Sequence, residues 1–373
     1  MTEPTIEPAV TVPAESDAPA GQAPAVQAPA VDEGAVTAGA VAVALDPEAA
    51  RRRRRKTLVL LFLAAALVLL TLFAGWYLIF RKPISTLPIP GIGLQELPHY
   101  SFSIYGVKAP MGVAVSPSGD RIYVTETGAG RLVHVFDSKG TEVGTFNPPK
   151  SEPATRVPVY IALDPDNGDV YVSDRMSAAI YIYDKDGRYR RQFEPTTKLE
   201  LFAPLGLAFD RQGNLYVTDV GGPIHRVVVF DRTGAIVRTI GEKGQFNFPN
   251  GLAVDDRGML FVADSNNGQV QVIDLTGRTI SVIPRGVASG ELGLPRGTAI
   301  DDGRRLYVAD STGQALQVYA LDDTTSKPKF YGTVGIEGMG DGQFEYPNGV
   351  ATDTRARIYI TDWANDRLQV WSY

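Results

Sequence analysis

The chain has 373 residues, a formal net charge of −6 and no cysteine. A net negative charge disfavours non-specific nucleic-acid binding, which depends on Lys and Arg side chains that neutralise phosphates. Without cysteine, this sequence can form no disulfide, thiolate metal site or thiol nucleophile.

Residues 1–50 form a low-complexity segment that is rich in Ala, Pro, Val and Thr and has no Lys, Arg or aromatic residue. Such a segment buries too little apolar surface to offset the entropy lost on ordering. We therefore expect a disordered tail. Its Pro-rich stretch leaves two roles open, a partner-binding segment or a purely solvated one.

A basic run at residues 51–56 precedes an uncharged apolar run at residues 57–80. At about 1.5 Å per residue, the apolar run is long enough to cross a hydrocarbon core of about 30 Å. Because more cations precede the span than follow it, the positive-inside rule places the N-terminus in the cytoplasm. The alternative, a cleaved signal peptide, requires a shorter apolar core nearer the N-terminus. We expect an uncleaved single-pass anchor in the plasma membrane.

Residues 81–98 contain Pro83, Pro88, Pro90 and Pro98. Proline lacks the N–H that helices and sheets need, and it stiffens the chain. The sequence therefore predicts that the helix ends at Pro83 and that a short linker follows.

Residues 99–373 contain six repeats, each of which opens with Pro and a short apolar run. The openings are Pro110, Pro158, Pro204, Pro249, Pro295 and Pro347. Each opening is followed by a polar turn, a second apolar run that ends in an acid, and a third alternating run. Short β-branched and aromatic runs separated by Asp/Gly turns predict strands. Several short strands every 45 or so residues are typical of β-propeller blades. The predicted fold is all-β, a six-bladed propeller.

Two blocks, Gly244–Gly251 and Gly340–Gly349, carry a more specific signal. Together with Tyr-Val-Ala-Asp after the turns and Leu-Gln-Val near the third strands, they resemble NHL repeats. The resemblance covers residues 99–373 and implies a six-bladed NHL β-propeller. Similar propellers serve as extracytoplasmic sensor domains of bacterial receptor kinases, with the same order of tail, span and propeller. Here the part before the span is too short and too simple in composition to be a kinase.

The last repeat ends at Tyr373 after its third strand. Upstream of the first repeat, residues 99–106 read as a free outer strand. We predict that this strand completes the last blade, because closure removes an open sheet edge that would invite aggregation.

The acids that end the second runs recur in every repeat. They are Glu126, Asp174, Asp219, Asp264, Asp310 and Asp362. A ring of carboxylates around a cation is one interpretation. Because the acid repeats with the blade, we favour the other, in which each acid caps its own following turn through an Asx hydrogen bond. We interpret Asp210, Asp255, Asp301 and Asp353, after the first strands, in the same way on the opposite face.

The three histidines, His99, His134 and His225, are dispersed along the chain. A zinc site needs converging ligands, so we predict none. The amidating lyases that share this repeat are metal enzymes with histidines near the axis and with disulfides. The chain matches neither feature.

The residue after each opening Pro is expected at the mouth of the central channel. The six occupants are Met111, Val159, Leu205, Asn250, Arg296 and Asn348. In propeller lactonases of the gluconolactonase type, oxygen-bearing side chains from such positions hold the catalytic divalent cation. Asn250 and Asn348 resemble that pattern, but the matching carboxylates are missing and Arg296 lies between the two amides. Such an ion prefers anionic oxygens and is repelled by a cation, so we predict no metal or other cofactor.

One half of this mouth is apolar and the other half is Asn–Arg–Asn. We hypothesise that it binds an anionic or carboxylate-bearing group with Arg296 as the bidentate anchor. The alternative is that Arg296 pairs with a blade aspartate, Asp264 or Asp310.

Three further residues are expected on the same face. Tyr160 stands where the other five repeats have Gly, so its ring projects toward the channel or distorts that blade. Arg175 and Trp363 follow the acids of the second and sixth repeats, on loops that should open onto this face. Tyr, Trp and Arg are typical interface anchors.

The sequence predicts a monomeric, membrane-anchored binding, sensing or scaffold module. Its propeller, outside the cytoplasm, would present the mouth to a protein, peptide or cell-envelope ligand and not to nucleic acid. The alternative is a propeller-type hydrolase or lyase, similar to lactonases, that acts at the central channel.

Overall fold

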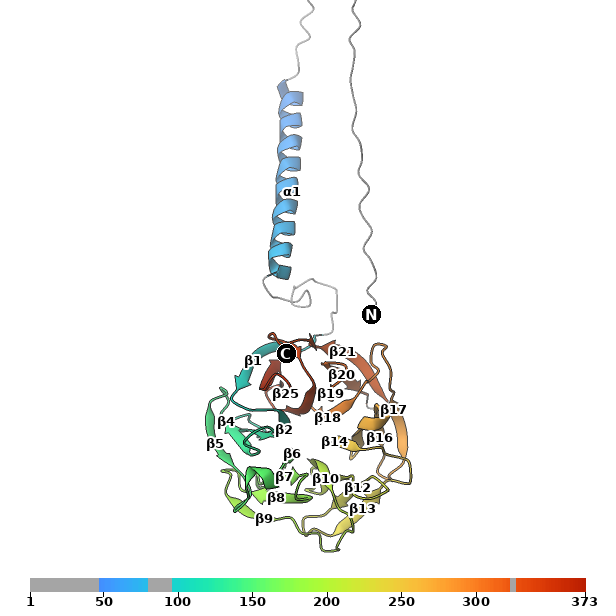
Figure 1. Ribbon diagram of the computed structural model, residues 1–373. Coiled ribbons are helices and arrows are strands. Elements are labelled where there is room, and N and C mark those ends of the chain that lie inside the picture. Colours follow the sequence, from blue (N-terminus) through green and yellow to red (C-terminus); the bar gives the residue numbers. More distant parts are fainter. Residues whose placement is uncertain (1–46, 80–95, 323–326) are drawn as a thin grey trace, which may run out of the picture. The chain divides into compact units, whose positions relative to one another are not determined.

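The computed structural model describes residues 47–79, 96–322 and 327–373 (Figure 1). The chain divides into two compact units, residues 1–82 and 83–373, which are treated separately below. The predicted tail falls mostly on residues 1–46, and most of the predicted linker falls on residues 80–95. Both lie outside the described residues and stay predictions.

The first unit contains helix α1 (Pro47–Ile79), which begins earlier than the sequence predicted and includes the basic run. Glu, Ala and Arg are good helix formers, and Pro is tolerated in a first turn, so the cations join the helix instead of preceding it. The stretch Arg54–Leu72 is long and apolar enough to cross a membrane, the one such stretch among the described residues.

The second unit consists, in its described residues, of six four-stranded antiparallel sheets and one short strand pair. Figure 1 shows the sheets arranged around a common centre. From the innermost strand outward, the first three blades are β2 (Pro110–Val115), β3 (Ile122–Glu126), β4 (Val133–Phe136), β5 (Glu142–Phe146); β6 (Pro158–Leu163), β7 (Val170–Asp174), β8 (Ala179–Tyr183), β9 (Tyr189–Gln192); β10 (Pro204–Phe209), β11 (Leu215–Asp219), β12 (Arg226–Phe230), β13 (Ile236–Ile240).

The other three blades are β14 (Pro249–Val254), β15 (Leu260–Asp264), β16 (Gln269–Ile273), β17 (Thr279–Ile283); β18 (Pro295–Ile300), β19 (Arg305–Asp310), β20 (Ala315–Leu321), β21 (Pro328–Val334); β24 (Pro347–Thr352), β25 (Arg357–Asp362), β26 (Arg367–Ser372), β1 (His99–Tyr105). The short parallel pair is β22 (Ile336–Glu337) and β23 (Gln343–Phe344). The six-bladed propeller is therefore confirmed.

Glycine in the innermost strands allows neighbouring blades to approach closely. A Cβ atom on Gly206 would lie 2.1 Å from the carbonyl oxygen of Asn250, and one on Gly251 would lie 2.6 Å from that of Arg296. Both distances are far below van der Waals contact, so a side chain there would push the blades apart. The Pro-x-Gly opening thus sets the tight inner ring around the channel.

A row of hydroxyl groups ties each blade to the next. Thr218 Oγ1 donates to the carbonyl of Asn250 at 2.8 Å, and Thr361 Oγ1 donates to that of Met111 across the closure, also at 2.8 Å. In the fourth and fifth blades the residue before the acid is Ala, which has no hydroxyl group. The Ser after the acid donates the hydrogen bond to the next blade instead. There Ser265 Oγ donates to Pro295 O at 2.5 Å.

The apolar core is divided among the interfaces between adjacent blades. Between the first two blades, for example, Phe146 and Tyr183 pack with ring centroids 4.4 Å apart, beside the buried Val172. Buried apolar side chains of this size stabilise a fold by about 2–5 kcal/mol each.

Strand β1 closes the ring as the sequence predicted. It pairs antiparallel with β26, from His99 opposite Ser372 to Tyr105 opposite Arg367. Ile104 of β1 is 2% exposed and packs into the apolar cluster between the sixth and first blades. Two distant segments of the chain therefore share one blade.

Candidate functional site

A cavity of about 540 Å³ opens at the channel mouth, where the innermost strands begin. The six residues proposed from the sequence all line it: Tyr160, Arg175, Asn250, Arg296, Asn348 and Trp363. The structure thus brings together side chains from the second, fourth, fifth and sixth blades. The loops after the second strands open onto the mouth, as the sequence predicted.

The apolar half of the cavity is built from the start of three innermost strands. Val159, Tyr160 and Leu205 are buried and pack in one cluster, with Met111 and Phe248 against it. These side chains come from neighbouring blades, so the surface they form is fixed by the ring and not by a mobile loop.

Tyr160 projects into the channel, and its strand has the same register shift after the opening Pro as the other five innermost strands. Its hydroxyl donates to Asn250 Oδ1 at 3.3 Å, which links the second blade to the fourth across the channel. Burial raises the pKa of Tyr160 to about 12, against a smaller opposing effect of the Arg296 charge. The phenol is therefore a neutral hydrogen-bond donor at physiological pH.

The two asparagines at the mouth hold the loops before them. Asn250 Nδ2 donates to the carbonyl of Phe248 at 3.1 Å, and Asn348 Nδ2 donates to that of Tyr346 at 3.0 Å. Phe248 and Tyr346 have φ values of 54° and 56°, a left-handed conformation that bulky residues rarely adopt. Both rings line the cavity. The amides therefore position these two aromatic residues, and direct ligand binding by the amides stays a prediction.

The alternative ion pairs of Arg296 with Asp264 or Asp310 are not present in the structure. Asp264 accepts hydrogen bonds from the backbone N–H of Asn247 and from three side-chain amides. Asp310 accepts three backbone N–H groups. Among the described residues, the Arg296 guanidinium has no hydrogen-bond or ion-pair partner, and it lies at the rim of a preformed cavity.

Two further arginines make the cavity strongly cationic. Arg131 lies in the loop after the acid of the first blade, and one of its nitrogens donates to Pro153 O at 3.2 Å. Arg175 is exposed in the corresponding loop of the second blade, and no side-chain partner is found for it among the described residues. The cavity lining contains three guanidinium groups and no carboxylate. Unpaired like charges around a concave, partly apolar site attract anions.

Trp363 of the sixth blade forms part of the cavity lining. Its ring packs edge-to-face on Tyr346, with centroids 6.3 Å apart and an interplanar angle of 82°. The side chain remains 38% exposed. A half-exposed Trp that is fixed by a neighbouring ring is well suited to anchor a ligand.

The acids at the ends of the second strands hold the loop that enters each innermost strand. Asp362 accepts from the N–H of Glu345, Asp174 from that of Val157, and Asp219 from that of Ala203. Asp174 and Asp219 also cap their own following turns. Asp310 does the same for the N–H of Gly313. The capping interpretation is thus confirmed for these three residues, and the contact with the preceding loop was missed.

The first blade deviates from this pattern because it carries Glu126. Its carboxylate accepts backbone N–H groups of Lys108 and Gly130 and contacts His134 Nε2 at 3.0 Å. Burial raises the pKa of Glu126, but these hydrogen bonds outweigh it and lower the pKa. His134 Nδ1 also lies 3.0 Å from Glu142, so this histidine links two carboxylates within its blade.

Across residues 47–79, 96–322 and 327–373, no group of three or more His, Asp or Glu side chains is placed to hold a metal. His225 is engaged at the mouth instead, where its Nδ1 accepts the N–H of Phe248 at 2.9 Å. It supports the left-handed residue that precedes the opening Pro of the fourth blade.

The lining residues that the sequence analysis missed include Arg131, Phe248 and Tyr346. Arg131 lies in the same loop class as Arg175 and Trp363, so comparison of the six repeats could have found it. Phe248 and Tyr346 directly precede an opening Pro. Their side chains point into the cavity because the backbone is left-handed at both positions. The sequence contains no pattern that predicts this conformation.

Fold and site together define a six-bladed β-propeller with a cationic cavity at one end of its channel. Residues 246–273 match the family model for the NHL repeat, so the chain carries an NHL repeat on this propeller.

Several known proteins are similar to parts of the chain. It is 28% identical over 162 residues to Protein brain tumor of Drosophila melanogaster, covering 43% of this chain and 15% of that protein. It is 27% identical over 239 residues to NHL repeat-containing protein 3 of Mus musculus, covering 60% of this chain and 54% of that protein. The chain thus spans about half or less of the length of these relatives.

A solved structure of a streptogramin B lyase has the same fold. Its TM-score is 0.53 at 14% sequence identity, and the match covers 73% of this chain and 96% of that one. At this identity the similarity concerns the propeller fold alone.

Proposed function

We propose that the propeller is a binding module whose channel-mouth cavity holds an acidic segment of a protein or peptide ligand. The observation that carries this proposal is a preformed cavity with three guanidinium groups and no carboxylate in its lining. An arginine fork recognises a carboxylate through two parallel, charge-assisted hydrogen bonds. The apolar floor at Val159 and Leu205 would take up the flanking apolar part of the same ligand.

The arrangement favours an extended acidic peptide over a small ion. Arg296 lies on an innermost strand, whereas Arg131 and Arg175 lie on loops of two other blades. A ligand that engages all three must span the mouth. The exposed Trp363 adds an anchor at the rim. Basic and aromatic residues around a concave face are typical of protein-binding surfaces.

The test replaces one cation in the cavity. A fluorescent peptide of alternating Leu and Glu is titrated against the full chain in detergent, and binding is followed by anisotropy. Arg296→Gln removes the two charge-assisted hydrogen bonds from the guanidinium to a ligand carboxylate. Binding should weaken by roughly tenfold or more. Arg285→Gln, at an exposed arginine outside the cavity, is the matched control and should leave binding unchanged. Equal binding by both variants would contradict the proposal.

We further propose that the propeller is held outside the cytoplasm by a single membrane span at residues 57–80. Support comes from the uncharged run inside α1 and from the cations that precede it. The resemblance to extracytoplasmic sensor domains of bacterial receptor kinases belongs to the same proposal. A signal would then pass to a separate partner, or the protein would act as a tether.

The topology can be tested directly because the chain has no cysteine. Ser177→Cys places a single thiol on an exposed loop of the propeller, and Thr37→Cys places one before the span. A membrane-impermeant maleimide should label the first variant in intact cells and the second only after lysis. The reverse pattern, or labelling of neither in intact cells, would show that the propeller is not outside.

The alternative of a lactonase-like hydrolase or lyase stays a prediction from the sequence. At the cavity a divalent cation would meet amide and hydroxyl oxygens beside three guanidinium groups and no lining carboxylate. Hard divalent ions prefer several carboxylates, so the residues present do not fit such a metal.

A further inference from the structure

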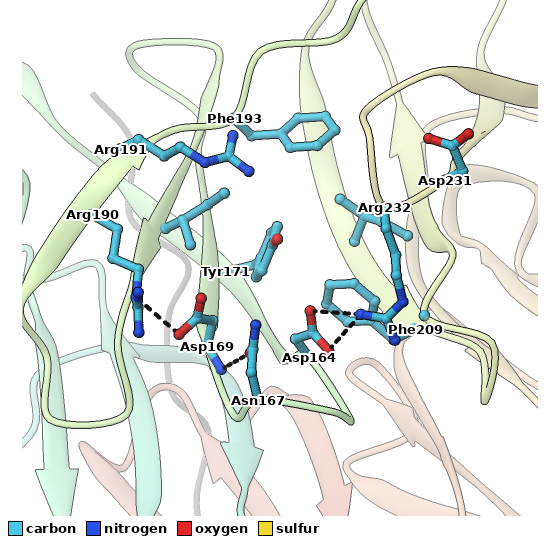
Figure 2. Close-up of a pocket in the computed structure, with 13 residues that line it drawn as sticks. Asp164, Asn167, Asp169, Tyr171, Arg190, Arg191, Phe193, Phe209, Asp231 and Arg232 are labelled. Carbon is cyan, nitrogen blue, oxygen red and sulfur yellow. Dashed lines mark hydrogen bonds and ion pairs between the residues drawn. The ribbon is translucent and has the colours of Figure 1, made fainter.

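A second cavity, of about 260 Å³, lies between the second and third blades (Figure 2). It is formed at the turns that follow the innermost strands β6 and β10 and at the turn between β12 and β13. These turns are at the face opposite the channel mouth, because successive antiparallel strands reverse direction. The two cavities share no lining residue. The second one is therefore an independent feature of the propeller.

Aromatic rings form the inner wall of this cavity. Tyr171 packs edge-to-face on Phe209 with centroids 5.0 Å apart, and its ring lies 6.4 Å from that of Phe193. Figure 2 shows Tyr171 near the centre of the view, with the Phe193 ring above it and the Phe209 ring to its lower right. Such rings offer apolar faces to a ligand without closing the space between them.

A buried carboxylate lies beside the aromatic wall. Asp169 is 8% exposed, and burial raises the pKa of its carboxyl. Arg190 Nε lies 3.0 Å from Asp169 Oδ1, but the geometry gives a charge contact and not a hydrogen bond, so that buried oxygen lacks a hydrogen-bond donor. The other oxygen, Asp169 Oδ2, is not enclosed in this way and accepts no hydrogen bond among the described residues, so it is the acceptor that a ligand hydroxyl group can reach.

Two donors face the same space without a protein partner. Among the described residues, neither the Tyr171 hydroxyl nor the Arg191 guanidinium has a hydrogen bond or ion pair. In Figure 2 the Arg191 side chain extends across the cavity above Tyr171. Both groups are therefore available to a ligand that brings acceptors.

The charges of the lining balance, in contrast to those at the channel mouth. The charged lining residues are Asp164, Asp169, Asp231, Arg190, Arg191 and Arg232. Arg232 lies 3.5 Å from Asp164 and also contacts Asp166, and Arg190 lies beside Asp169. An anion would meet three carboxylates here, and a cation would meet three guanidinium groups. The cavity is suited to a neutral ligand.

We propose that the cavity between the second and third blades binds one pyranose ring of a neutral carbohydrate. The hydroxyl groups of such a ring donate to Asp169 and accept from Tyr171 and Arg191. Its C–H face packs on the aromatic wall. The volume is smaller than that of a typical drug-sized site, which suits a single ring. The proposal does not depend on the acidic ligand at the channel mouth.

Saturation-transfer NMR on the full chain tests this, because it detects weak binding of small sugars. The chain is kept in a polyoxyethylene detergent, since glycoside detergents would compete. Methyl glucoside, methyl galactoside and N-acetylglucosamine are the neutral probes, and glucuronate is the charged probe. We expect saturation transfer to at least one neutral sugar at millimolar concentration. Absence of transfer to every neutral sugar, or transfer to glucuronate alone, would overturn the proposal.

Tyr171→Phe is the diagnostic variant. Its hydroxyl has no partner in the described structure, so the melting temperature should not change, while sugar binding should weaken about fivefold through the lost hydrogen bond. Tyr181→Phe removes a hydroxyl on the neighbouring strand, outside this cavity, that has no hydrogen bond to any described residue, and it should not weaken binding. Arg296→Gln should leave sugar binding intact. If Tyr171→Phe binds sugar as the unmodified chain does, the site is not this cavity.

Discussion

Deletion of residues 99–106 is expected to lower the free energy of unfolding by at least about 5 kcal/mol. The deletion removes β1, so the backbone groups of β26 lose their outer partner along the whole strand. It also removes Ile104 from the apolar cluster that joins the sixth and first blades. Because folded domains are stable by only about 5–15 kcal/mol in total, most of the cooperative unfolding transition should disappear.

Denaturant unfolding of the full chain, followed by near-ultraviolet circular dichroism, measures this effect. Ile104→Ala, which keeps the strand but removes its most buried side chain, should give a smaller loss of about 2–5 kcal/mol. His99→Ala, at the exposed start of the strand, should be close to neutral. A deletion variant whose unfolding curve matches that of the intact chain would show that β1 does not close the propeller.

The second large effect is expected for Asp362→Ala. The Asp362 carboxylate is fully buried and accepts the Glu345 N–H at 2.7 Å and Arg367 Nε at 2.8 Å. The Arg367 side chain is only 3% exposed. Removal of the carboxylate leaves a buried guanidinium without its counter-charge, which costs about 3–5 kcal/mol.

The same substitution releases the loop that enters the innermost strand of the sixth blade. That loop carries Tyr346 and leads to Asn348, so the rim of the channel mouth should loosen as well. Thermal unfolding is the measurement, and Asp302→Ala, at an exposed aspartate, is the matched control. A loss of less than about 1 kcal/mol for Asp362→Ala would contradict the inferred role of this ion pair.

The repeated pattern of the sequence was sufficient to predict the fold. Six Pro openings at similar spacing, with an acid after each second run, predicted six blades, and the unpaired third strand at the C-terminus predicted closure by residues 99–106. These features recur in all six repeats, so the prediction of the fold rests on many residues and not on any single one. The early start of α1 at Pro47 was missed because the basic run looked like a boundary, although Arg is a good helix former.

The candidate sites were harder to predict because they depend on departures from the repeat. Tyr160 and Arg296 were visible as departures within aligned positions. The conformation of Phe248 was not, because a left-handed backbone at an aromatic residue is held by contacts from Asn250 and His225, which the sequence does not relate to it.

The cavity between the second and third blades could not be predicted from the sequence, because its residues do not depart from the repeat. Asp169 and Tyr171 look like ordinary turn and strand residues of the second blade. The cavity that they line forms only when Phe209 and Arg232 of the third blade lie beside the second blade.

The most direct test of the central claim compares two peptides that differ only in charge. The full chain is titrated with the Leu–Glu peptide and with its twin, in which Gln replaces every Glu. We predict that the acidic peptide binds at least about tenfold more tightly at low salt, and that the difference shrinks as ionic strength rises. Equal affinity for the two peptides would contradict a cationic binding site at the channel mouth.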